Sequence, residues 1–302
     1  MFLIGIYLMK TVNTNIQTIG YTVAALTAFA ANSVLCRIAL KDDVIDASSF
    51  TAIRLLSGVF MFLVLLSFKA KQSVSTPNKK AGNWKTALML FIYAIAFSYA
   101  YISLDTGTGA LVLFGAVQLT MIATSVFKGK ELHISEWLGV LISFSGLAYL
   151  VYPTLTTPSL SGFILMGLSG IAWGMYTSVG RGSIDPMRDT ASNFKYTVPL
   201  VVVLVLITFP AINISFYGVV LAVISGALAS ALGYTIWYIA LRGLSEVEAA
   251  VVQLSVPVIA AIGGVLFVSE SISIRLVIAC ILVLGGIFTV LVSRWRFVKK
   301  QA

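Results

Sequence analysis

Apolar stretches of about twenty residues recur along the whole chain and leave no segment for a soluble domain. Each stretch is long enough to cross the roughly 30 Å hydrocarbon core of a bilayer, which about twenty helical residues span. Only 10% of the 302 residues are charged, whereas soluble globular domains carry roughly 25%. The sequence therefore predicts an all-α integral membrane protein.

Ten transmembrane spans are expected on these apolar stretches. They run over Ile19–Leu40, Phe50–Phe68, Thr86–Leu104, Thr106–Phe127, Ile134–Tyr152, Ser161–Gly180, Ala191–Ile212, Phe216–Leu241, Glu246–Val268 and Ile272–Ser293. The segment from Lys69 to Lys80 is too basic and too poor in apolar residues to be anything but a loop.

The formal charge of +9 would suggest a nucleic-acid partner if the basic residues shared one folded surface. They lie instead in short connectors and in a basic tail at residues 294–302. With the N-terminus inside, most of them become cytoplasmic, as the positive-inside rule requires. We therefore expect a multi-pass protein of the bacterial inner membrane with both termini in the cytoplasm. Its expected partners are the lipid bilayer and a small solute, with no nucleic acid and no obligate protein partner.

Several other classes of protein are disfavoured by what the sequence lacks. Cys36 and Cys280 both fall within predicted spans, so neither a disulfide framework nor a Cys-based metal site is supported. The first nine residues are apolar but too short to span, and no basic region precedes them, so no cleaved signal peptide is expected. Because no metal-ligand cluster, nucleotide-binding glycine loop or nucleophile with a base is found, no cofactor, no metal and no enzymatic activity is expected.

The chain compared with itself indicates a duplication of five spans. The matching residues keep the same order and similar offsets: Arg37 with Arg181, Arg54 with Lys195, Tyr101 with Tyr238, Glu131 with Glu270, and Gly146 with Gly285. An odd number of spans forces the second copy, residues 161–293, to enter the membrane in the opposite direction from the first, residues 18–152. Inverted repeats of this kind support alternating access to a central site.

Local motifs add a family resemblance to this pattern. Span one ends in NSVLCRIAL from Asn32, span two opens with Arg54 in AIRLL, and an acidic residue follows the fourth span of each half, at Glu131 and Glu270. In these features residues 18–293 resemble the EamA family of the drug/metabolite transporter superfamily. Pro257 stands where that family has a helix proline, but the first half has Gln118 at the matching position.

Three further motifs resemble the branch of the family that contains bacterial aromatic amino acid exporters. They are FGAVQLTM from Phe114, GIAWGMYTSVGRG from Gly170 and the NF pair at Asn193. The resemblance implies ten helices, cytoplasmic termini and movement of amino acids or similar small metabolites. Substrates within such a fold diverge widely, so the resemblance does not name the solute.

Polar and aromatic residues near the centres of spans are the candidates for binding a solute, because a polar group costs most at that depth. Amides and hydroxyls bond both ends of a zwitterion, and aromatic faces accommodate apolar groups and attract cations. The alternative for each is a bond to a neighbouring helix, worth about 0.6 kcal/mol. The candidates are Asn32, Ser98, Gln118, Trp173, Tyr176, Tyr234 and Gln253.

Three residues suggest how access is controlled. Pro257 has no N–H and so frees the carbonyl of Gln253, which predicts either a gating kink or a bend that only shapes packing. Arg54 and Lys195 enter their spans by only about one turn, so both are expected to snorkel to the interface. One cation would then lie near each mouth, where it draws in a carboxylate. No acidic residue and no histidine reaches the middle of a span, so no midplane proton carrier is expected.

These observations predict a carrier of small neutral or zwitterionic metabolites, with apolar and aromatic amino acids foremost and export as the direction. A nucleotide-sugar or sugar-phosphate carrier remains an alternative, although it would want basic side chains deeper in the membrane. An integral-membrane enzyme would need a polar catalytic cluster, and a pore is disfavoured by the inverted repeat.

Overall fold

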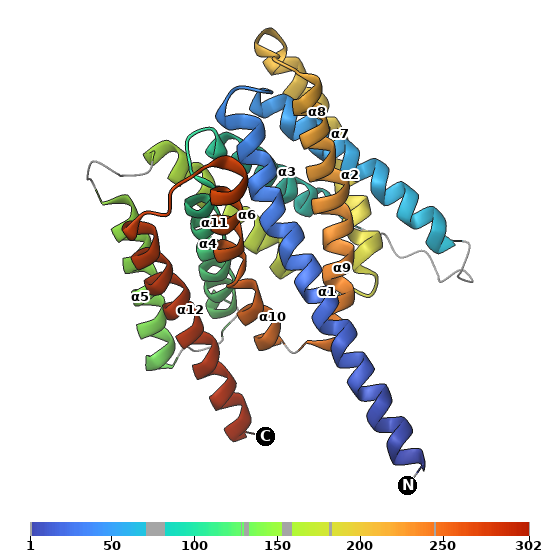
Figure 1. Ribbon diagram of the computed structural model, residues 1–302, viewed down its shortest axis with the longest axis vertical. Coiled ribbons are helices and arrows are strands. Elements are labelled where there is room, and N and C mark those ends of the chain that lie inside the picture. Colours follow the sequence, from blue (N-terminus) through green and yellow to red (C-terminus); the bar gives the residue numbers. More distant parts are fainter. Residues whose placement is uncertain are drawn as a thin grey trace.

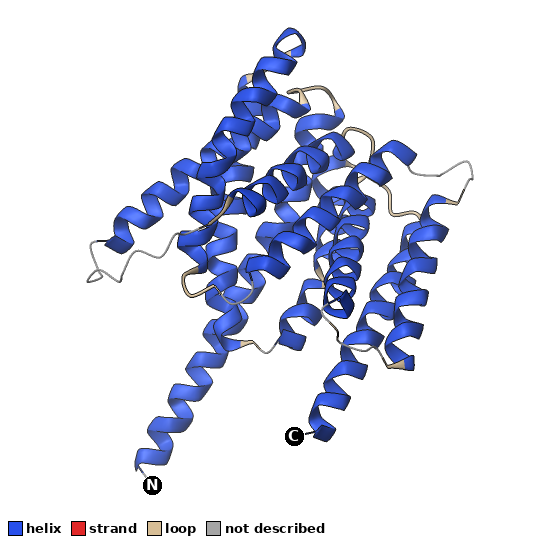
Figure 2. Ribbon diagram, turned by 180° about the vertical axis from the view of Figure 1, so that it is seen from behind, coloured by secondary structure: helices blue, strands red, loops and turns tan. Residues whose placement is uncertain are grey.

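The chain forms a bundle of helices, seen from two sides in Figures 1 and 2. A computed structural model describes residues 2–70, 82–127, 129, 133–152, 159–180, 183–244 and 246–301. Among them the only β pairing is an isolated bridge between Ile45 and Ile214. The helices are α1 (Phe2–Lys41), α2 (Ala47–Ala70), α3 (Trp84–Tyr101), α4 (Thr106–Phe127), α5 (Ile134–Val151), α6 (Leu160–Gly180), α7 (Pro186–Thr208), η1 (Phe209–Ala211), α8 (Phe216–Val223), η2 (Ile224–Leu232), α9 (Gly233–Ala240), η3 (Leu241–Gly243), α10 (Glu246–Gln253), α11 (Val256–Val268) and α12 (Ile274–Gln301).

In the described part of the chain, eight helical segments are long and apolar enough to cross a membrane. They are Ile16–Lys41, Ala47–Phe68, Thr106–Phe127, Leu160–Gly180, Pro186–Ala211, Phe216–Gly243, Ala249–Val268 and Ile274–Ser293. Each overlaps a predicted span. Helices α3 and α5 occupy the other two predicted spans but do not reach the same combination of length and hydropathy. The chain is thus a multi-pass membrane protein, and the count of ten crossings stays a prediction.

The outer surface of the bundle carries large apolar side chains. Phe60 on α2, Leu206 on α7, and Leu266 and Phe267 on α11 are all largely exposed. Apolar patches of this extent drive association in water, whereas lipid tails solvate them. The distribution of exposed side chains therefore agrees with a bilayer as the solvent.

Helix boundaries differ from the expectation where capping chemistry extends a helix. Helix α7 begins at Pro186, before the predicted Ala191, because the Asp185 side chain accepts a hydrogen bond from the Arg188 N–H at 3.2 Å. Proline at the first helical position lacks only an N–H that would be unpaired there anyway. Helix α1 extends from Phe2 rather than Ile19, and α12 continues through the predicted tail to Gln301. Most of the predicted Lys69–Lys80 loop, together with Glu131 and Arg181, lies outside the described residues.

Two of the predicted spans are not regular α-helices. The segment Phe216–Gly243 passes through the π-helix η2, and the ninth span is interrupted at Leu254 and Ser255. Pro257 is the second residue of α11, so it begins a new helix instead of kinking a continuous one as predicted. Its missing N–H cannot bond the Gln253 carbonyl, which ends α10. Helix α4 runs unbroken through Gln118.

Helices from the two halves of the sequence interleave. Helix α1 packs against α9 and α11, α4 packs against α6 and α11, and α3 packs against α6. Helix α2 lies against η2 and α7, and α5 lies beside α12 at the edge of the bundle (Figure 1). Both termini project from the same end of the molecule (Figure 1). This arrangement encloses a space between α1, α3, α4, α6, α9 and α10.

Candidate functional site

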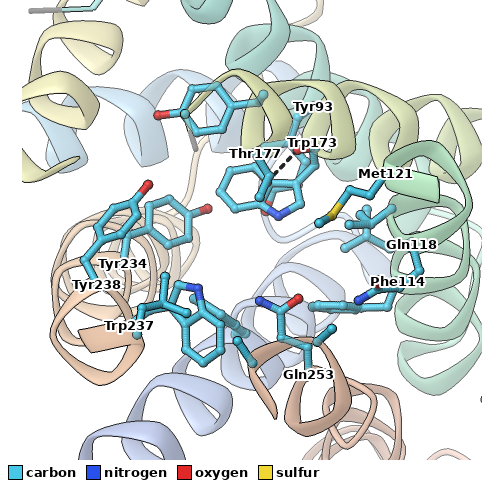
Figure 3. A pocket seen from close by; sticks show the side chains of 18 of the residues that line it. Tyr93, Phe114, Gln118, Met121, Trp173, Thr177, Tyr234, Trp237, Tyr238 and Gln253 are labelled. Carbon is cyan, nitrogen blue, oxygen red and sulfur yellow. Dashed lines mark hydrogen bonds between the residues drawn. The ribbon is translucent and has the colours of Figure 1, made fainter. Parts of the chain in front are cut away.

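A cavity of about 340 Å³ occupies this space, which is within the usual range for small-molecule sites. Figure 3 shows aromatic side chains and two amides surrounding it. At one end it reaches Gly180, Ser183 and Pro186 as well as Leu241 and Leu244, on the side where the termini lie. Among the described residues no charged side chain lines it. The lining comes from helices of both halves of the chain.

Trp173 on α6 is the centre of an aromatic cluster in the wall. Its ring lies 4.7 Å from that of Tyr93 and 5.0 Å from that of Tyr234, between centroids. It stacks on Tyr176 at 5.2 Å with an angle of 22° between the planes. Aromatic pairs at these separations stabilise one another beyond their buried area. The cluster therefore forms a firm apolar wall that suits an aromatic or large aliphatic group.

Two amides face the cavity from different helices (Figure 3). Gln118 on α4 is 3% exposed, and its Nε2 has no hydrogen-bond partner within the described structure. An unsatisfied buried amide costs about 1–3 kcal/mol, so a ligand acceptor at this position gains from it. Gln253 lines the cavity from the last residue of α10. The sequence predicted both residues as candidates, and they lie at one cavity.

Asn32 on α1 is held by the π-helix η2. Its Nδ2 donates to Ser230 Oγ at 3.5 Å, and its Oδ1 accepts a hydrogen bond from Ser225. A π-helix closes its hydrogen bonds five residues apart, so Ser225 and Ser230 share one face and both reach the same amide. Asn32 is 4% exposed and lines the cavity. The widened helix thus fixes the orientation of a cavity side chain.

Arg54 does not snorkel to a mouth as predicted. It is 2% exposed, and its Nη2 donates to the Tyr93 hydroxyl at 2.9 Å. The prediction was wrong because α2 begins at Ala47, which sets Arg54 about two turns inside on the face that packs against η2. Lys195, its predicted counterpart on α7, is exposed. The two cations therefore occupy unlike positions.

Ser98 is the one predicted substrate contact that the structure places away from the cavity. Its Oγ donates to the Ala94 carbonyl at 3.0 Å and accepts from Thr51 Oγ1 at 2.8 Å. The Thr51 bond joins α3 to α2, which is the helix-bonding alternative, and the Ala94 bond lies within α3. The other six predicted substrate contacts, Asn32, Gln118, Trp173, Tyr176, Tyr234 and Gln253, all line one cavity.

A buried ion pair lies at the end of the bundle away from the termini. Arg37 Nε lies 2.9 Å from Glu270 Oε1, and Arg37 Nη1 donates to the carbonyls of Tyr101 and Ile102 at 2.9 and 3.0 Å. Glu270 Oε2 accepts from the Thr106 N–H at 2.8 Å. This network links α1, the turn between α3 and α4, and the end of α11. Such charge-assisted bonds are among the stronger contacts in proteins.

A second carboxylate lies on the rim of this ion pair. Asp105 Oδ1 is 3.3 Å from Arg37 Nη2, but the Asp105 side chain is 60% exposed. Partial burial and the Glu270 charge raise the pKa of Asp105, against the opposing effect of Arg37. The ion pair between Arg37 and Glu270 is therefore the shorter and more buried of the two, and the ion pair with Asp105 lies at the surface.

The sequence analysis missed the Arg37–Glu270 pair, the depth of Arg54, and several aromatic residues of the cavity, among them Phe29, Tyr93, Phe97 and Trp237. The internal repeat does single out Arg37, Arg54 and Glu270, because each has a counterpart in the other half of the chain. This equivalence is a better guide to their importance than their distance from the end of a span. Within the described residues no group of three or more His, Cys, Asp or Glu side chains is placed to hold a metal ion.

Comparison with known proteins agrees with this architecture. The EamA-like transporter family matches residues 17–152 and 160–292. An uncharacterized protein of Pseudomonas aeruginosa is 48% identical over 278 residues, covering 92% of this chain and 96% of its own. An uncharacterized transporter of Archaeoglobus fulgidus is 24% identical, covering 67% and 74%, and the uncharacterized transporter YoaV of Bacillus subtilis is 19% identical, covering 79% and 85%.

A solved crystal structure shares the fold alone, at 17% identity and a TM-score of 0.60 over 88% of this chain and 94% of its own. The two segments that match the family take up most of the sequence. The chain therefore belongs to the EamA-like transporter family and is a membrane transporter rather than an enzyme.

Proposed function

We propose that the chain is an alternating-access carrier of small neutral or zwitterionic metabolites, with apolar and aromatic amino acids as the leading solutes. The observation that carries this proposal is the cavity itself: aromatic walls, two facing amides and no charged lining side chain among the described residues. Aromatic faces suit an apolar side chain and an ammonium group, and amides bond either end of a zwitterion.

The two ends of the cavity differ, as one state of an alternating-access cycle requires. One end extends to the connectors on the side of the termini, whereas the Arg37–Glu270 network lies outside the cavity lining, toward the opposite end of the bundle. We place the termini in the cytoplasm of a bacterial inner membrane, so that this state faces the cytoplasm and loads solute for export. The positive-inside bias of the sequence supports this orientation.

Helix pairing supports ten helices in two inverted repeats. In the two proposed repeats, α1 is equivalent to α6, and α4 is equivalent to α11. The contact between α1 and α11 is therefore equivalent to the contact between α6 and α4, and both contacts are present. The contact between α1 and α9 likewise corresponds to that between α6 and α3. Inverted repeats rock about a central axis and expose one site to each side in turn.

A nucleotide-sugar or sugar-phosphate carrier is the alternative, and the cavity disfavours it. Phosphoryl groups carry up to two charges and call for several cations. Among the described residues that line the cavity there is no Arg or Lys. Arg54 lies next to the lining residue Tyr93 and does not line the cavity itself.

Counterflow into liposomes tests the proposal. Liposomes that contain the purified protein are preloaded with an unlabelled solute. Labelled amino acids, polyamines and nucleotide sugars are then offered outside them in turn. We expect exchange of apolar and aromatic amino acids. Exchange confined to nucleotide sugars, or to polyamines, would replace the proposed solute class.

A further inference from the structure

The guanidinium of Arg54 lies behind the inner wall of the cavity, enclosed by two aromatic rings. Its Cζ is 5.3 Å from the Tyr93 ring centroid and 4.8 Å from that of Phe97. Its Nε donates to Ser230 Oγ at 3.4 Å and its Nη2 to the Tyr93 hydroxyl at 2.9 Å. All of these groups are neutral, so nothing in this shell balances the charge.

Arg54 is an incompletely satisfied cation. Its Nη1 is buried without a hydrogen-bond partner, and in the described structure no carboxylate lies within ion-pair distance of it. Arginine stays protonated in proteins, so it cannot escape burial by losing its charge. Cation–π contacts recover up to about 2 kcal/mol, while the cost of burying an ion is several kcal/mol. An anion bound nearby would relieve this imbalance.

Arg54 is connected to the cavity through the residues that line it. Tyr93 and Phe97 line the cavity on one face and cover the guanidinium on the other. Asn32 also lines it and shares Ser230 with Arg54. A phenol that accepts from a guanidinium retains its own O–H to donate. The inner wall therefore presents donors backed by a positive charge.

We propose that Arg54 and Tyr93 form the carboxylate subsite of the cavity. The solute binds with its carboxylate toward the Tyr93 hydroxyl, and the Arg54 charge holds it there. Arg54 Nη1, which has no partner, is a second donor for this carboxylate once side chains adjust, as they commonly do on binding. The apolar body of the solute then lies against Trp173 and Tyr234. This inference rests on the proposed function and narrows it to carboxylate-bearing solutes.

A single cation selects the kind of anion. One guanidinium matches one carboxylate in charge and in planar geometry. The two other buried arginines of the described structure are engaged elsewhere: Arg37 pairs with Glu270, and Arg275 donates to the Tyr152 carbonyl. The subsite therefore suits a monocarboxylate, including the carboxylate of an amino acid, rather than a phosphate.

The test compares phenylalanine with analogues changed at one polar end: phenylalaninamide and phenylalaninol lack the carboxylate, and 3-phenylpropionate keeps it but lacks the amino group. Phenylalanine, phenylalaninamide, phenylalaninol and 3-phenylpropionate are offered to the wild-type protein at neutral pH, with thermal stabilisation and competition for counterflow as readouts. We expect phenylalanine and 3-phenylpropionate to bind at least tenfold more tightly than the amide and the alcohol. Equal binding of acid and amide by the wild-type protein would overturn the inference, and this comparison needs no variant to fold.

Variants then assign the preference to the subsite. Arg54→Gln should bring the acid and the amide to within about twofold of each other, Arg54→Lys should keep part of the difference, and Tyr93→Phe should reduce it. Lys85→Gln, which removes an exposed cation from the same helix as Tyr93, should leave it unchanged. A purely structural role for Arg54 would lower binding of all four compounds by the same factor and would overturn the inference.

The outcomes also separate this inference from the proposed function. If 3-phenylpropionate binds and exchanges while no amino acid does, the amino-acid proposal fails and the carboxylate subsite stands. If amino acids exchange but their amides exchange equally well, the subsite fails and the carrier proposal stands.

Discussion

Arg37 and Glu270 join the two halves of the chain across 2.9 Å at the end of the bundle away from the termini. Glu270 reaches Arg37 because Ser269, the residue that follows α11, is in the left-handed conformation with φ of 57°, and the chain turns back toward α1. Gly264 makes room for this turn, since a Cβ there would lie 2.5 Å from Glu270 Oε2. The ion pair therefore depends on local backbone geometry as well as on charge.

Breaking this pair should open the far end of the cavity. Glu270→Gln keeps an acceptor for the Thr106 N–H but removes the charge, and hydrogen bonds to charged groups contribute about 1.5–3 kcal/mol. A loss of that size shifts a two-state equilibrium by roughly tenfold or more. The measurement is labelling of a cysteine at Leu113, which lines the cavity, by an impermeant maleimide in intact cells of a variant lacking Cys36 and Cys280. We expect labelling to become faster.

Asp105→Asn is the matched control for this prediction. Its longer, largely exposed contact to Arg37 contributes little, so labelling at Leu113 should stay near the rate of the parent protein. Equal labelling rates in Glu270→Gln and Asp105→Asn would mean that the ion pair does not control this end.

Gly226→Ala should strongly destabilise the protein. A Cβ at Gly226 would lie 2.0 Å from the Arg54 carbonyl oxygen, so α2 and η2 would have to separate. Overpacking typically costs about 1–3 kcal/mol, and a clash with backbone cannot be relieved by a rotamer change. The control is Gly285→Ala on α12, where nothing lies within 4 Å. Thermal unfolding in detergent should show a lower Tm for the first variant only.

The sequence predicted the helical elements well because hydropathy reports a property of each segment by itself. Six of the seven predicted substrate contacts line one cavity, since depth along a span also follows from local position. Arg54 was misplaced because burial depends on which neighbouring helix covers it, and hydropathy does not encode that. The Arg37–Glu270 pair joins residues 233 positions apart, so only the packed structure brings them together.

The two ends of the bundle should face opposite sides of the membrane. The start of α7, which Ile184 precedes, lies toward the end that holds the termini, and the segment that follows α11 and includes Ser271 lies at the other end (Figure 1). Both residues are exposed. With cytoplasmic termini, a cysteine at Ser271 in the cysteine-free background should react with an impermeant maleimide in intact cells. A cysteine at Ile184 should react only after the cells are opened. The reverse pattern would invert the orientation.

Exchange of solute should not require an imposed proton gradient. Among the described residues that line the cavity there is no Asp, Glu or His to carry a proton. Counterflow into liposomes should therefore proceed at equal pH on both sides. If counterflow appeared only with a pH difference, a titratable group at a membrane edge, such as Glu270, would become the candidate carrier.

Gln118 and Trp173 should contribute to solute binding in different ways. The unsatisfied Nε2 of Gln118 is available to a solute acceptor, and losing a neutral hydrogen bond costs about 0.5–1.5 kcal/mol. Gln118→Ala should therefore weaken affinity by up to about tenfold for every solute that presents a hydrogen-bond acceptor to this amide.

Trp173→Ala removes the ring that contacts Tyr93, Tyr176 and Tyr234, so large aromatic solutes should lose more affinity than small ones. Ser98→Ala is the control, because Ser98 bonds α2 instead of lining the cavity. The measurement is counterflow at matched amounts of folded protein, with amino acids of graded side-chain size. If both variants kept the affinity and size preference of Ser98→Ala, Gln118 and Trp173 would serve helix packing, and the solute would bind elsewhere.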